Sequence, residues 1–239
     1  MATFVLVPGA WHGSWAFETV NPLLEAAGHT TYALTLTGLA PDDDAAVMAA
    51  ANLDRHVADV LQVLDRFQLT DVTLVGHSYG GMVISAAADQ AVGRISRLVY
   101  LDAYVPRNGD SCWSLTSEAY RQAFASGAAE TGYSVKPPFR PPHGGDPRRR
   151  PHPLASLVQS INLTGTVDRT LQRDFIYCSG WEDQTPFAGI RTELGADPDW
   201  NVYDIPTPHN AMREDPEIVA AILAGTVRAA NRTGEREGG

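Results

Sequence analysis

The feature that most constrains the fold is the segment Val75–Gly81, with the sequence VGHSYGG. It follows an apolar, β-branched run at 71–75 that is typical of a buried strand, and it precedes an Ala-rich run at 81–88 that favours a helix. A Gly-X-Ser-X-Gly motif between a strand and a helix indicates a nucleophile elbow, in which the serine lies on a sharp turn with its hydroxyl exposed. The glycines leave room for that turn, because side chains there would clash with neighbouring backbone. The motif therefore predicts Ser78 as a nucleophile at the carboxyl end of a strand.

Strand-like and helix-like segments alternate through the first hundred residues and again near the end of the chain. The expected strands are 4–7, 30–34, 72–75, 95–101, 175–178 and 202–205, and the expected helices are 17–27, 53–67, 81–88 and 216–229. This alternation predicts an α/β fold, with a mostly parallel sheet flanked by helices. A chain of 239 residues is long enough for one such domain, 1–239, but not for two.

The alternation breaks between about residues 103 and 170. A Pro-rich segment at 136–147 cannot lie inside a helix or a sheet, and several aromatic residues surround it. A long insertion between two core strands is usually a lid or a binding loop in a compact enzyme. We therefore expect a cap or lid insertion at about 103–170, after the sixth strand.

Composition excludes several classes of partner. The net charge of −10 argues against nucleic acid or an anionic membrane as a partner. No apolar stretch of about 18 residues predicts a membrane span, and the start of the chain does not resemble a signal peptide. The two cysteines, Cys112 and Cys178, are too few for a disulfide scaffold, and their spacing matches no metal motif. We expect a cytoplasmic protein without a cofactor or metal, a monomer or homodimer; the single lysine among 18 basic residues hints at a bacterial source.

A serine hydroxyl is a poor nucleophile near pH 7, so it needs a base and a third group that orients the base. His209 is the expected base, because it follows a late strand and because the chain order on this type of fold is serine, acid, histidine. The acid is expected in the turn after the strand at 175–178, where Glu182 and Asp183 are adjacent and the sequence alone excludes neither. We choose Asp183, which the Gly-X-X-Asp-X-X-Pro arrangement places well into the turn. Asp102, at the end of an earlier strand, is a weaker candidate that we expect to shape the base of the lid.

Acyl transfer also needs hydrogen-bond donors for the negative charge that develops on the carbonyl oxygen, and losing one such donor costs about 3 kcal/mol. The backbone N–H of Tyr79, directly after the nucleophile, is one expected donor. The other is the N–H of Ala10, which Gly9 allows to turn into the same space. The loop lacks both a Walker lysine and a Gly-X-Gly-X-X-Gly pattern, which argues against a phosphate site.

Four segments together resemble the α/β-hydrolases, specifically the plant-type methylesterase and hydroxynitrile lyase group with its bacterial esterase relatives: 5–15, 76–81, 101–106 and 208–212. Similar proteins usually have His-Gly where this chain has Pro8-Gly9, which alters what lines the loop. Hydroxynitrile lyases of the group carry threonine at the position of Gly9 and lysine at the position of Asn210, and both serve cyanohydrin cleavage. Their absence favours ester hydrolysis through a Ser78 acyl-enzyme.

The substrate implied by this resemblance is a small carboxylic ester, and a methyl ester of an aromatic secondary metabolite is our leading expectation. Aromatic residues in the lid and near the expected site indicate an apolar or aromatic acyl group. The expected substrate-binding residues are Trp11, His12, Trp113, Tyr120 and Trp181, with His12 also bracing its loop through hydrogen bonds. The run Arg148–Arg150 could attract an acidic substrate, but a run flanked by prolines is more often a solvated surface.

Two other classes of function stay open. A lyase could use the same triad, and a haloperoxidase-like side activity occurs on similar scaffolds. A ligand-binding receptor is the alternative outside enzymology, since plant hormone receptors resemble this fold. Repeated turnover distinguishes an enzyme from a receptor.

Overall fold

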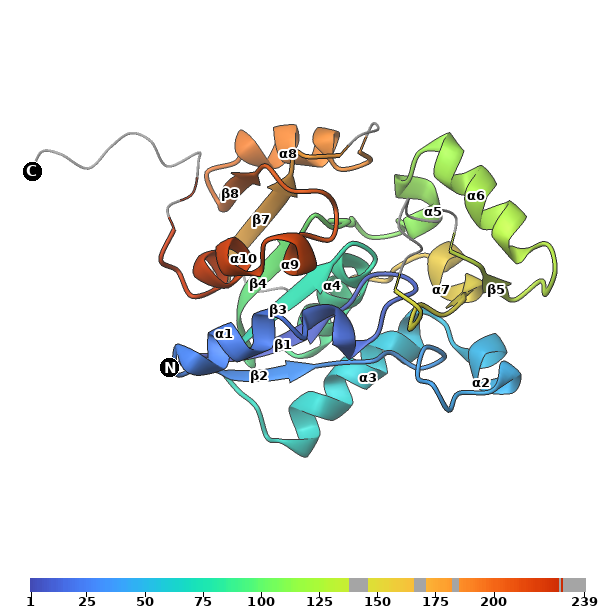
Figure 1. The fold of residues 1–239 in the computed structure, drawn as a ribbon, viewed down its shortest axis with the longest axis horizontal. Helices are drawn as coiled ribbons and strands as arrows, with labels where there is room; N and C mark the ends of the chain where they lie inside the picture. Colours follow the sequence, from blue (N-terminus) through green and yellow to red (C-terminus); the bar gives the residue numbers. More distant parts are fainter. Residues whose placement is uncertain (138–145, 166–170, 182–184, 228, 230–239) are drawn as a thin grey trace, which may run out of the picture.

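Six parallel strands form the central sheet, in the order β2-β1-β3-β4-β7-β8 (Figure 1). The computed structural model describes residues 1–137, 146–165, 171–181, 185–227 and 229. The strands are β1 (Thr3–Val7), β2 (Thr30–Ala33), β3 (Val72–His77), β4 (Ile95–Leu101), β7 (Gln172–Cys178) and β8 (Trp200–Ile205). Because parallel strands end at the same edge of a sheet, the loops that follow β1, β3, β4, β7 and β8 lie together.

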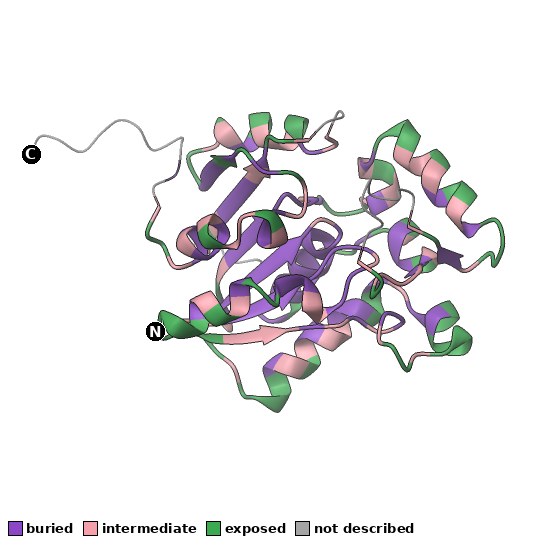
Figure 2. Cartoon of the chain, in the orientation of Figure 1, coloured by how far each residue is buried: buried purple, intermediate pink, exposed green. Residues whose placement is uncertain are grey.

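Helices cover both faces of this sheet (Figures 1 and 2). One hydrophobic cluster joins the sheet to α3 (Leu53–Arg66) and α4 (Gly80–Gln90), and a second joins it to α1 (Val20–Ala26) and α10 (Pro216–Leu223). Alternate residues of β1 belong to different clusters, because successive side chains of a strand point to opposite faces. The predicted parallel α/β architecture is therefore confirmed.

Two helices illustrate how local sequence fixes these elements. In α3 the buried residues recur with a helical period along one face, and the Asn52 side chain caps the helix by accepting from the N–H of Arg55 at 2.9 Å. In α10 the Asp215 side chain caps a helix that begins with Pro216, a residue suited to the first helical position. The remaining elements outside the insertion are short: η1 (Ser14–Phe17), α2 (Ala45–Ala50), α8 (Ala188–Gly195) and α9 (Ala211–Glu214).

Five short elements lie between β4 and β7, outside the central sheet. They are α5 (Cys112–Leu115), α6 (Glu118–Ala128), the antiparallel pair β5 (Ser134–Val135) and β6 (His152–Pro153), and α7 (Leu154–Val158). We call these five elements the cap. They lie to one side of the sheet, beyond the carboxyl ends of its strands (Figure 1). The insertion follows β4, the fourth strand along the chain and not the sixth, and most of the Pro-rich segment lies outside the described residues.

Two predicted helices differ by several residues at one end from those observed. The segment expected as one helix at 17–27 forms η1 and then α1, and the last helix ends at Leu223 instead of Ala229. The polar tail expected at 231–239 lies outside the described residues. No helix in the described part of the chain is long and apolar enough to cross a membrane.

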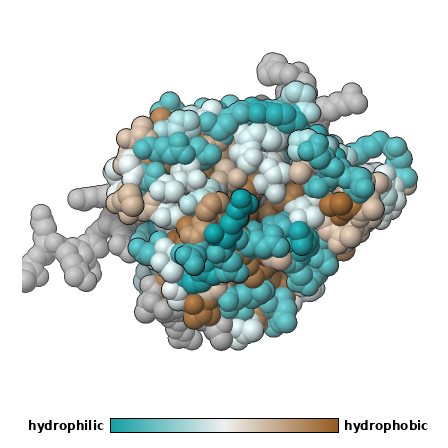
Figure 3. Space-filling model, turned by 90° about the horizontal axis from the view of Figure 1, so that it is seen from below, coloured by the Kyte–Doolittle hydropathy of each residue, from teal (hydrophilic) through white to brown (hydrophobic). Residues whose placement is uncertain are grey.

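Exposed apolar side chains are scattered over the surface. The large ones, apart from Met1, are Val47, Phe67, Val92 and Val158, which belong to different segments of the chain. Figure 3 shows one face of the molecule, on which hydrophobic residues form several separate patches among hydrophilic ones.

Replacing Gly81 with alanine is expected to lower the free energy of unfolding by about 2–3 kcal/mol. A Cβ at this position would lie 2.1 Å from the backbone oxygen of Tyr104, so the start of α4 would have to move away from the loop after β4. Gly189→Ala in α8 is the matched control, because a Cβ there meets nothing within 4 Å and alanine favours the helix. Urea unfolding followed by circular dichroism measures both variants. Equal stability of the two variants would contradict the close approach at Gly81.

Candidate active site

Ser78 follows β3 and has the left-handed backbone conformation that a nucleophile elbow requires, with a φ of 53°. A Cβ at Gly76 would lie 2.6 Å from the backbone oxygen of Gly80, and a Cβ at Gly80 would lie 2.5 Å from that of Val7. Both glycines of the motif are therefore required, because a side chain at either position would clash with neighbouring backbone. The strained serine conformation persists because strands and helix on either side hold it.

His209 is oriented by a buried carboxylate. Its Nδ1 lies 2.7 Å from Oδ2 of Asp102, whose side chain is completely buried. Asp102 also accepts hydrogen bonds from the indole Nε1 of Trp181 at 2.8 Å and from the backbone N–H of Cys178 at 3.2 Å. Since a carboxylate only accepts, Nδ1 of His209 carries the proton and the lone pair lies on Nε2. This tautomer is the one that a general base for serine needs.

The expected acid, Asp183, and its alternative, Glu182, both lie outside the described residues. Nδ1 of His209 donates its proton to Asp102. We therefore replace Asp183 with Asp102 as the proposed acid, correcting the expectation that Asp102 shapes the lid base. The signal available in the sequence was the place of Asp102 directly after β4, but only the strand order shows that β4 is the neighbour of the nucleophile strand.

His77, inside the motif, holds the histidine loop, a role that the sequence did not reveal. Its Nε2 donates to the backbone oxygen of His209 at 3.0 Å, and the two ring centroids lie 4.4 Å apart. Burial lowers the pKa of His77 well below its ordinary value, so the ring is neutral. A Cβ at Gly9 would lie 2.8 Å from both Nδ1 of His77 and Cβ of Ser78, which explains why this loop needs glycine.

The two expected oxyanion donors lie beside Ser78. Ala10 and Tyr79 both line the pocket that contains Ser78 and His209, and no described residue accepts a hydrogen bond from either backbone N–H. The phenol of Tyr79 is fixed away from the chemistry, because its hydroxyl donates to Nδ1 of His56 at 2.8 Å. Nε2 of His56 in turn donates to the backbone oxygen of Thr37 at 2.9 Å. The geometry is compatible with the oxyanion hole predicted from the sequence.

The cap holds the loop that carries Ala10. Trp11 has a left-handed φ of 67°, and its backbone N–H donates to Nδ1 of His152 in β6 at 3.3 Å. Its indole Nε1 donates to the backbone oxygen of Val135 in β5 at 2.8 Å. Nε2 of His152 lies 2.9 Å from the hydroxyl of Ser156, which donates to a backbone oxygen. Docking of the cap therefore fixes the conformation of Trp11 next to the predicted donor.

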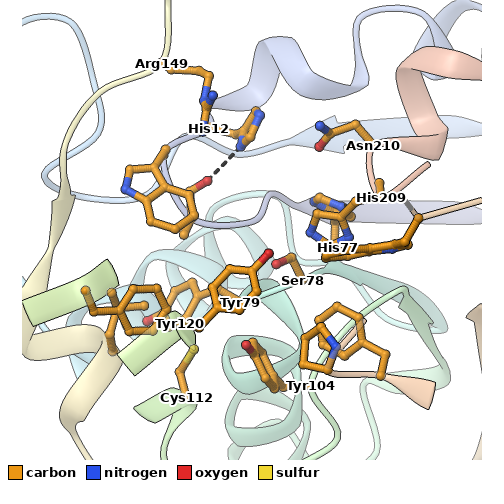
Figure 4. Close-up of a pocket in the computed structure, with 17 residues that line it drawn as sticks. His12, His77, Ser78, Tyr79, Tyr104, Cys112, Tyr120, Arg149, His209 and Asn210 are labelled. Carbon is orange, nitrogen blue, oxygen red and sulfur yellow. Dashed lines mark hydrogen bonds between the residues drawn. The ribbon is translucent and has the colours of Figure 1, made fainter. Parts of the chain in front are cut away.

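The pocket has a volume of about 220 Å³ and apolar walls (Figure 4). Four predicted substrate-binding residues line it, namely Trp11, His12, Tyr120 and Trp181. Trp113 is not among the lining residues; its ring packs against Phe124, with 6.4 Å between centroids, and its contact with substrate stays a prediction. Residues that were not among the five expected substrate-binding residues also line it: Tyr104, Phe124, Arg149, Leu157, Phe187 and Asn210.

Two titratable residues of the pocket are neutral near pH 7. Burial lowers the pKa of His12 to about 4, and its Nδ1 donates to the backbone oxygen of Ala10 at 2.7 Å, so His12 braces its loop as expected. Burial raises the pKa of Cys112 to about 12, which leaves a thiol and not the nucleophilic thiolate. Among the described residues, no group of three or more His, Cys, Asp or Glu side chains could hold a metal ion.

The free energy of unfolding is expected to fall steeply as the pH drops from about 6.5 to 4. Burial lowers the pKa of four histidines, to about 4 for His12 and His56 and well below 6.5 for His77 and His152. Between these values the unfolded chain binds protons that the folded chain does not, so each histidine contributes a slope of up to about 1.4 kcal/mol per pH unit. Denaturant unfolding at pH 7.0, 5.5 and 4.5 measures the slope.

His56→Gln is the control for this slope, because the amide can keep both hydrogen bonds of His56 without binding a proton. It should lower the slope by up to about 1.4 kcal/mol per pH unit. If the free energy of unfolding of the wild type stayed constant from pH 6.5 to 4.5, this would contradict the claim that the four buried histidines are neutral in the folded protein.

Comparison with known proteins agrees with this architecture. The sequence profile of the alpha/beta hydrolase family matches residues 4–230. A protein described as a carbendazim hydrolyzing esterase, from a Nocardioides species, is 35% identical over 94% of this chain and 99% of its own length. Methylesterase 2 of Arabidopsis thaliana is 36% identical over 104 residues, but the match spans only 43% of this chain and 40% of the relative.

A solved structure shares the fold over nearly the whole chain. An extracellular alpha/beta-hydrolase from a Paenibacillus species, described as homologous to tobacco salicylic acid binding protein 2, superposes with a TM-score of 0.80. The two proteins are 21% identical, and the match covers 94% of this chain and 98% of that one. The full-length sequence matches, together with a serine elbow and a carboxylate-oriented histidine in one pocket, show that the chain belongs to the alpha/beta hydrolase family and is a serine hydrolase.

Proposed function

We propose that this protein hydrolyses methyl esters of small acids through an acyl-enzyme on Ser78. The observation that carries the proposal is the hydrogen bond between Nδ1 of His209 and the buried Asp102, in the pocket that also contains Ser78. This arrangement leaves the basic Nε2 of His209 to act on a hydroxyl, which is the essential requirement of a serine nucleophile.

In the proposed reaction, Oγ of Ser78 attacks the ester carbonyl carbon while Nε2 of His209 takes the hydroxyl proton. The buried Asp102 stabilises the imidazolium that forms, and the amides of Ala10 and Tyr79 donate to the oxyanion. The carbon–oxygen bond to the alcohol then breaks, and His209 gives its proton to the departing methoxide, which leaves as methanol. Water repeats the sequence on the acyl-enzyme, releasing the carboxylic acid and restoring Ser78.

The size of the pocket favours an acyl group with one ring. An apolar cavity of about 150 Å³ is enough to bind benzene. The pocket here has about 220 Å³, so it fits a substituted ring but not a large polycyclic acid. Its aromatic walls include Trp11, Tyr120 and Phe187, which suit a flat apolar acyl group.

The names of similar proteins support an ester as the class of substrate. The names of two relatives describe hydrolysis of carbendazim and a methylesterase, respectively, and carbendazim itself is a methyl carbamate. We therefore include methyl carbamates beside methyl esters in the proposed range. A role in secondary metabolism, a cytoplasmic location and a monomeric or homodimeric state stay predictions.

The geometry argues against the lyase alternative. Threonine at the position of Gly9 would place a Cβ 2.8 Å from Nδ1 of His77, so the surroundings of Ser78 would have to shift. Asn210 lines the pocket where lyases of the group carry lysine, and an amide supplies no positive charge for departing cyanide. Hydrolysis needs neither group.

The test is methanol release from methyl benzoate, methyl phenylacetate and carbendazim, measured at micromolar enzyme with substrate in large excess. We expect many turnovers per protein molecule. The two esters should give a carboxylic acid in equal amount to methanol, and carbendazim should give the free amine and carbon dioxide in equal amount to methanol. Release of a single equivalent, followed by no further reaction, would favour a receptor. No release from any ester by folded protein would contradict the proposed function.

A further inference from the structure

The peptide bond between Ala10 and Trp11 is held on both sides by histidine side chains. Its carbonyl oxygen accepts from Nδ1 of His12 at 2.7 Å, the hydrogen bond drawn from His12 in Figure 4. Its N–H donates to Nδ1 of His152 at 3.3 Å. His12 lies in the same loop as the peptide, whereas His152 begins β6 of the cap. Rotation of the peptide would break both hydrogen bonds, so its plane is fixed.

Each polar group of Trp11 bonds to the chain between β4 and β7. Besides the N–H, which reaches His152, the carbonyl oxygen accepts from the N–H of Arg150 at 3.1 Å, and the indole Nε1 donates to the backbone oxygen of Val135 at 2.8 Å. The left-handed φ of 67° is costly for a residue with a side chain, and these contacts hold it. The backbone conformation next to Ala10 therefore depends on the cap.

His152 presents a lone pair to the N–H of Trp11. Its Nε2 donates to the hydroxyl of Ser156 at 2.9 Å, and that hydroxyl donates to the backbone oxygen of Pro153 at 2.8 Å. The side chain is completely buried, which lowers the pKa of the ring well below its ordinary value and keeps it neutral near pH 7. A neutral ring with its proton on Nε2 has its acceptor on Nδ1. The contact with Ser156 therefore selects the tautomer that can hold Trp11.

The ring of His152 also packs against the residue that carries the second expected oxyanion donor. Its centroid lies 4.8 Å from that of Tyr79, with an angle of 71° between the ring planes. The Tyr79 side chain is fixed at its other end, because its hydroxyl donates to Nδ1 of His56 at 2.8 Å. His152 thus contacts both segments that supply the expected donors, the loop after β1 and the elbow after β3.

We propose that His152 is a positioning residue for the oxyanion hole: it holds the Trp11 peptide so that the neighbouring Ala10 N–H points toward the carbonyl oxygen of the ester. The proposal rests on the proposed esterase function and gives the cap a part in the reaction, in addition to forming a wall of the pocket. His152 does not line the pocket, so it acts through Trp11 and Ala10. Because an oxyanion forms only during the reaction, loss of this contact should slow turnover without weakening ester binding.

Two amide substitutions separate this role from general packing. Asparagine places its side-chain oxygen where Nδ1 of His152 lies, whereas glutamine places its polar atoms where Nε2 lies and leaves the N–H of Trp11 without its acceptor. In His152→Gln, kcat for methyl benzoate should fall at least about 30-fold, with KM within about threefold of the wild type. His152→Asn should keep kcat within about fivefold. If His152→Gln does not fold, as judged by circular dichroism, His152→Leu also removes the acceptor and should show the same loss.

Affinity for a tetrahedral analogue is the readout that packing alone would not change. With phenyl trifluoromethyl ketone, Oγ of Ser78 attacks the carbonyl carbon, the serine proton passes to His209, and the oxyanion that forms needs the same donors. Acetophenone fits the same pocket without forming this adduct. In His152→Gln, inhibition by the trifluoromethyl ketone should weaken at least about 30-fold and inhibition by acetophenone less than about threefold. In His152→Asn, both should stay within about fivefold of the wild type.

His29→Gln is the matched control. Nδ1 of His29 also accepts a backbone N–H, that of Ala2 at 3.1 Å, but this contact precedes β1 and so lies at the edge of the sheet opposite the pocket. The substitution should change kcat and the affinity for either ketone by less than about twofold.

Unchanged kcat and unchanged affinity for the trifluoromethyl ketone in folded His152→Gln would overturn the role of His152. An equal weakening of both ketones, or an equal loss of kcat in His152→Asn, would overturn it as well. Ser78-dependent hydrolysis by the wild type would then show that the esterase function itself stands. A wild type that neither hydrolyses the ester nor binds the trifluoromethyl ketone more tightly than acetophenone would contradict both proposals.

Discussion

Asp102→Asn is expected to lower kcat/KM for a methyl ester by about 10³–10⁴-fold with little change in KM. An asparagine amide at this site can no longer accept the Nδ1 proton of His209 and stabilise the imidazolium as a carboxylate does. Its single NH2 group would replace either Oδ2, which now accepts from Trp181 and lies beside His209, or Oδ1, which now accepts from the N–H of Cys178, so that an N–H group would face another donor in either orientation. The base would then lose both its tautomer and its orientation. Steady-state kinetics across pH 6–9 measure the effect.

Asp183→Asn is the matched control for this prediction, since Asp183 is the acid expected from the sequence. It should retain kcat/KM within about threefold, because Asp102 already accepts the proton of His209. Circular dichroism and thermal unfolding establish that both variants are folded. A severe loss in Asp183→Asn together with a mild one in Asp102→Asn would show that Asp183 is the acid after all.

Ser78→Ala is expected to remove nearly all turnover, at least about 10⁵-fold in kcat, while leaving substrate binding measurable. Alanine at the elbow deletes only the hydroxyl, so the walls of the pocket stay in place. The loss should therefore affect kcat and not the affinity for the ester. Single-turnover kinetics with p-nitrophenyl acetate should show no release burst in the variant.

Ser85→Ala is the control for the serine substitution. Ser85 lies in the same helix α4, where its hydroxyl donates to the backbone oxygen of Gly81 at 2.7 Å, but it is not among the pocket residues. Its loss should cost about 1 kcal/mol of stability and leave kcat within a few fold. Activity that survives Ser78→Ala would exclude Ser78 as the nucleophile.

The fold was largely predictable because each layer carries a local signal. Buried parallel strands are nearly continuous apolar runs, and Ile95–Leu101 was predicted with its observed bounds. Helix α3 shows its buried face as a helical period, which placed it within one residue. By contrast, α2 and α8 were not predicted, since both are short and neither repeats an apolar face clearly.

Site residues could be predicted from the sequence only where one continuous segment determines their geometry. The elbow at Ser78 is such a segment, because its glycines and its strand and helix are consecutive in the sequence. The acid is different: Asp102 and His209 are 107 positions apart, and their contact depends on the order of the strands in the sheet. The order of residues along the chain favoured Asp183 as the acid, whereas the order of strands in the sheet favours Asp102.

Individual pocket contacts also depend on tertiary packing. Trp113 and Phe124 both belong to the cap, yet only Phe124 lines the pocket. The three arginines at 148–150 are chemically identical in the sequence, and their different partners arise from the loops packed around them. Residue type predicts what a side chain can do, and packing decides which residue of a run does it.

The most direct test of the account is labelling with a fluorophosphonate, followed by intact-mass measurement and peptide mapping. An activated serine attacks the phosphorus and displaces fluoride, which leaves one phosphonyl group on the protein. We predict a single label on Ser78, formed at least about 10³-fold more slowly in Asp102→Asn. A folded wild type that stays unlabelled, or that carries its label on another residue, would contradict the claim that His209 and Asp102 activate Ser78.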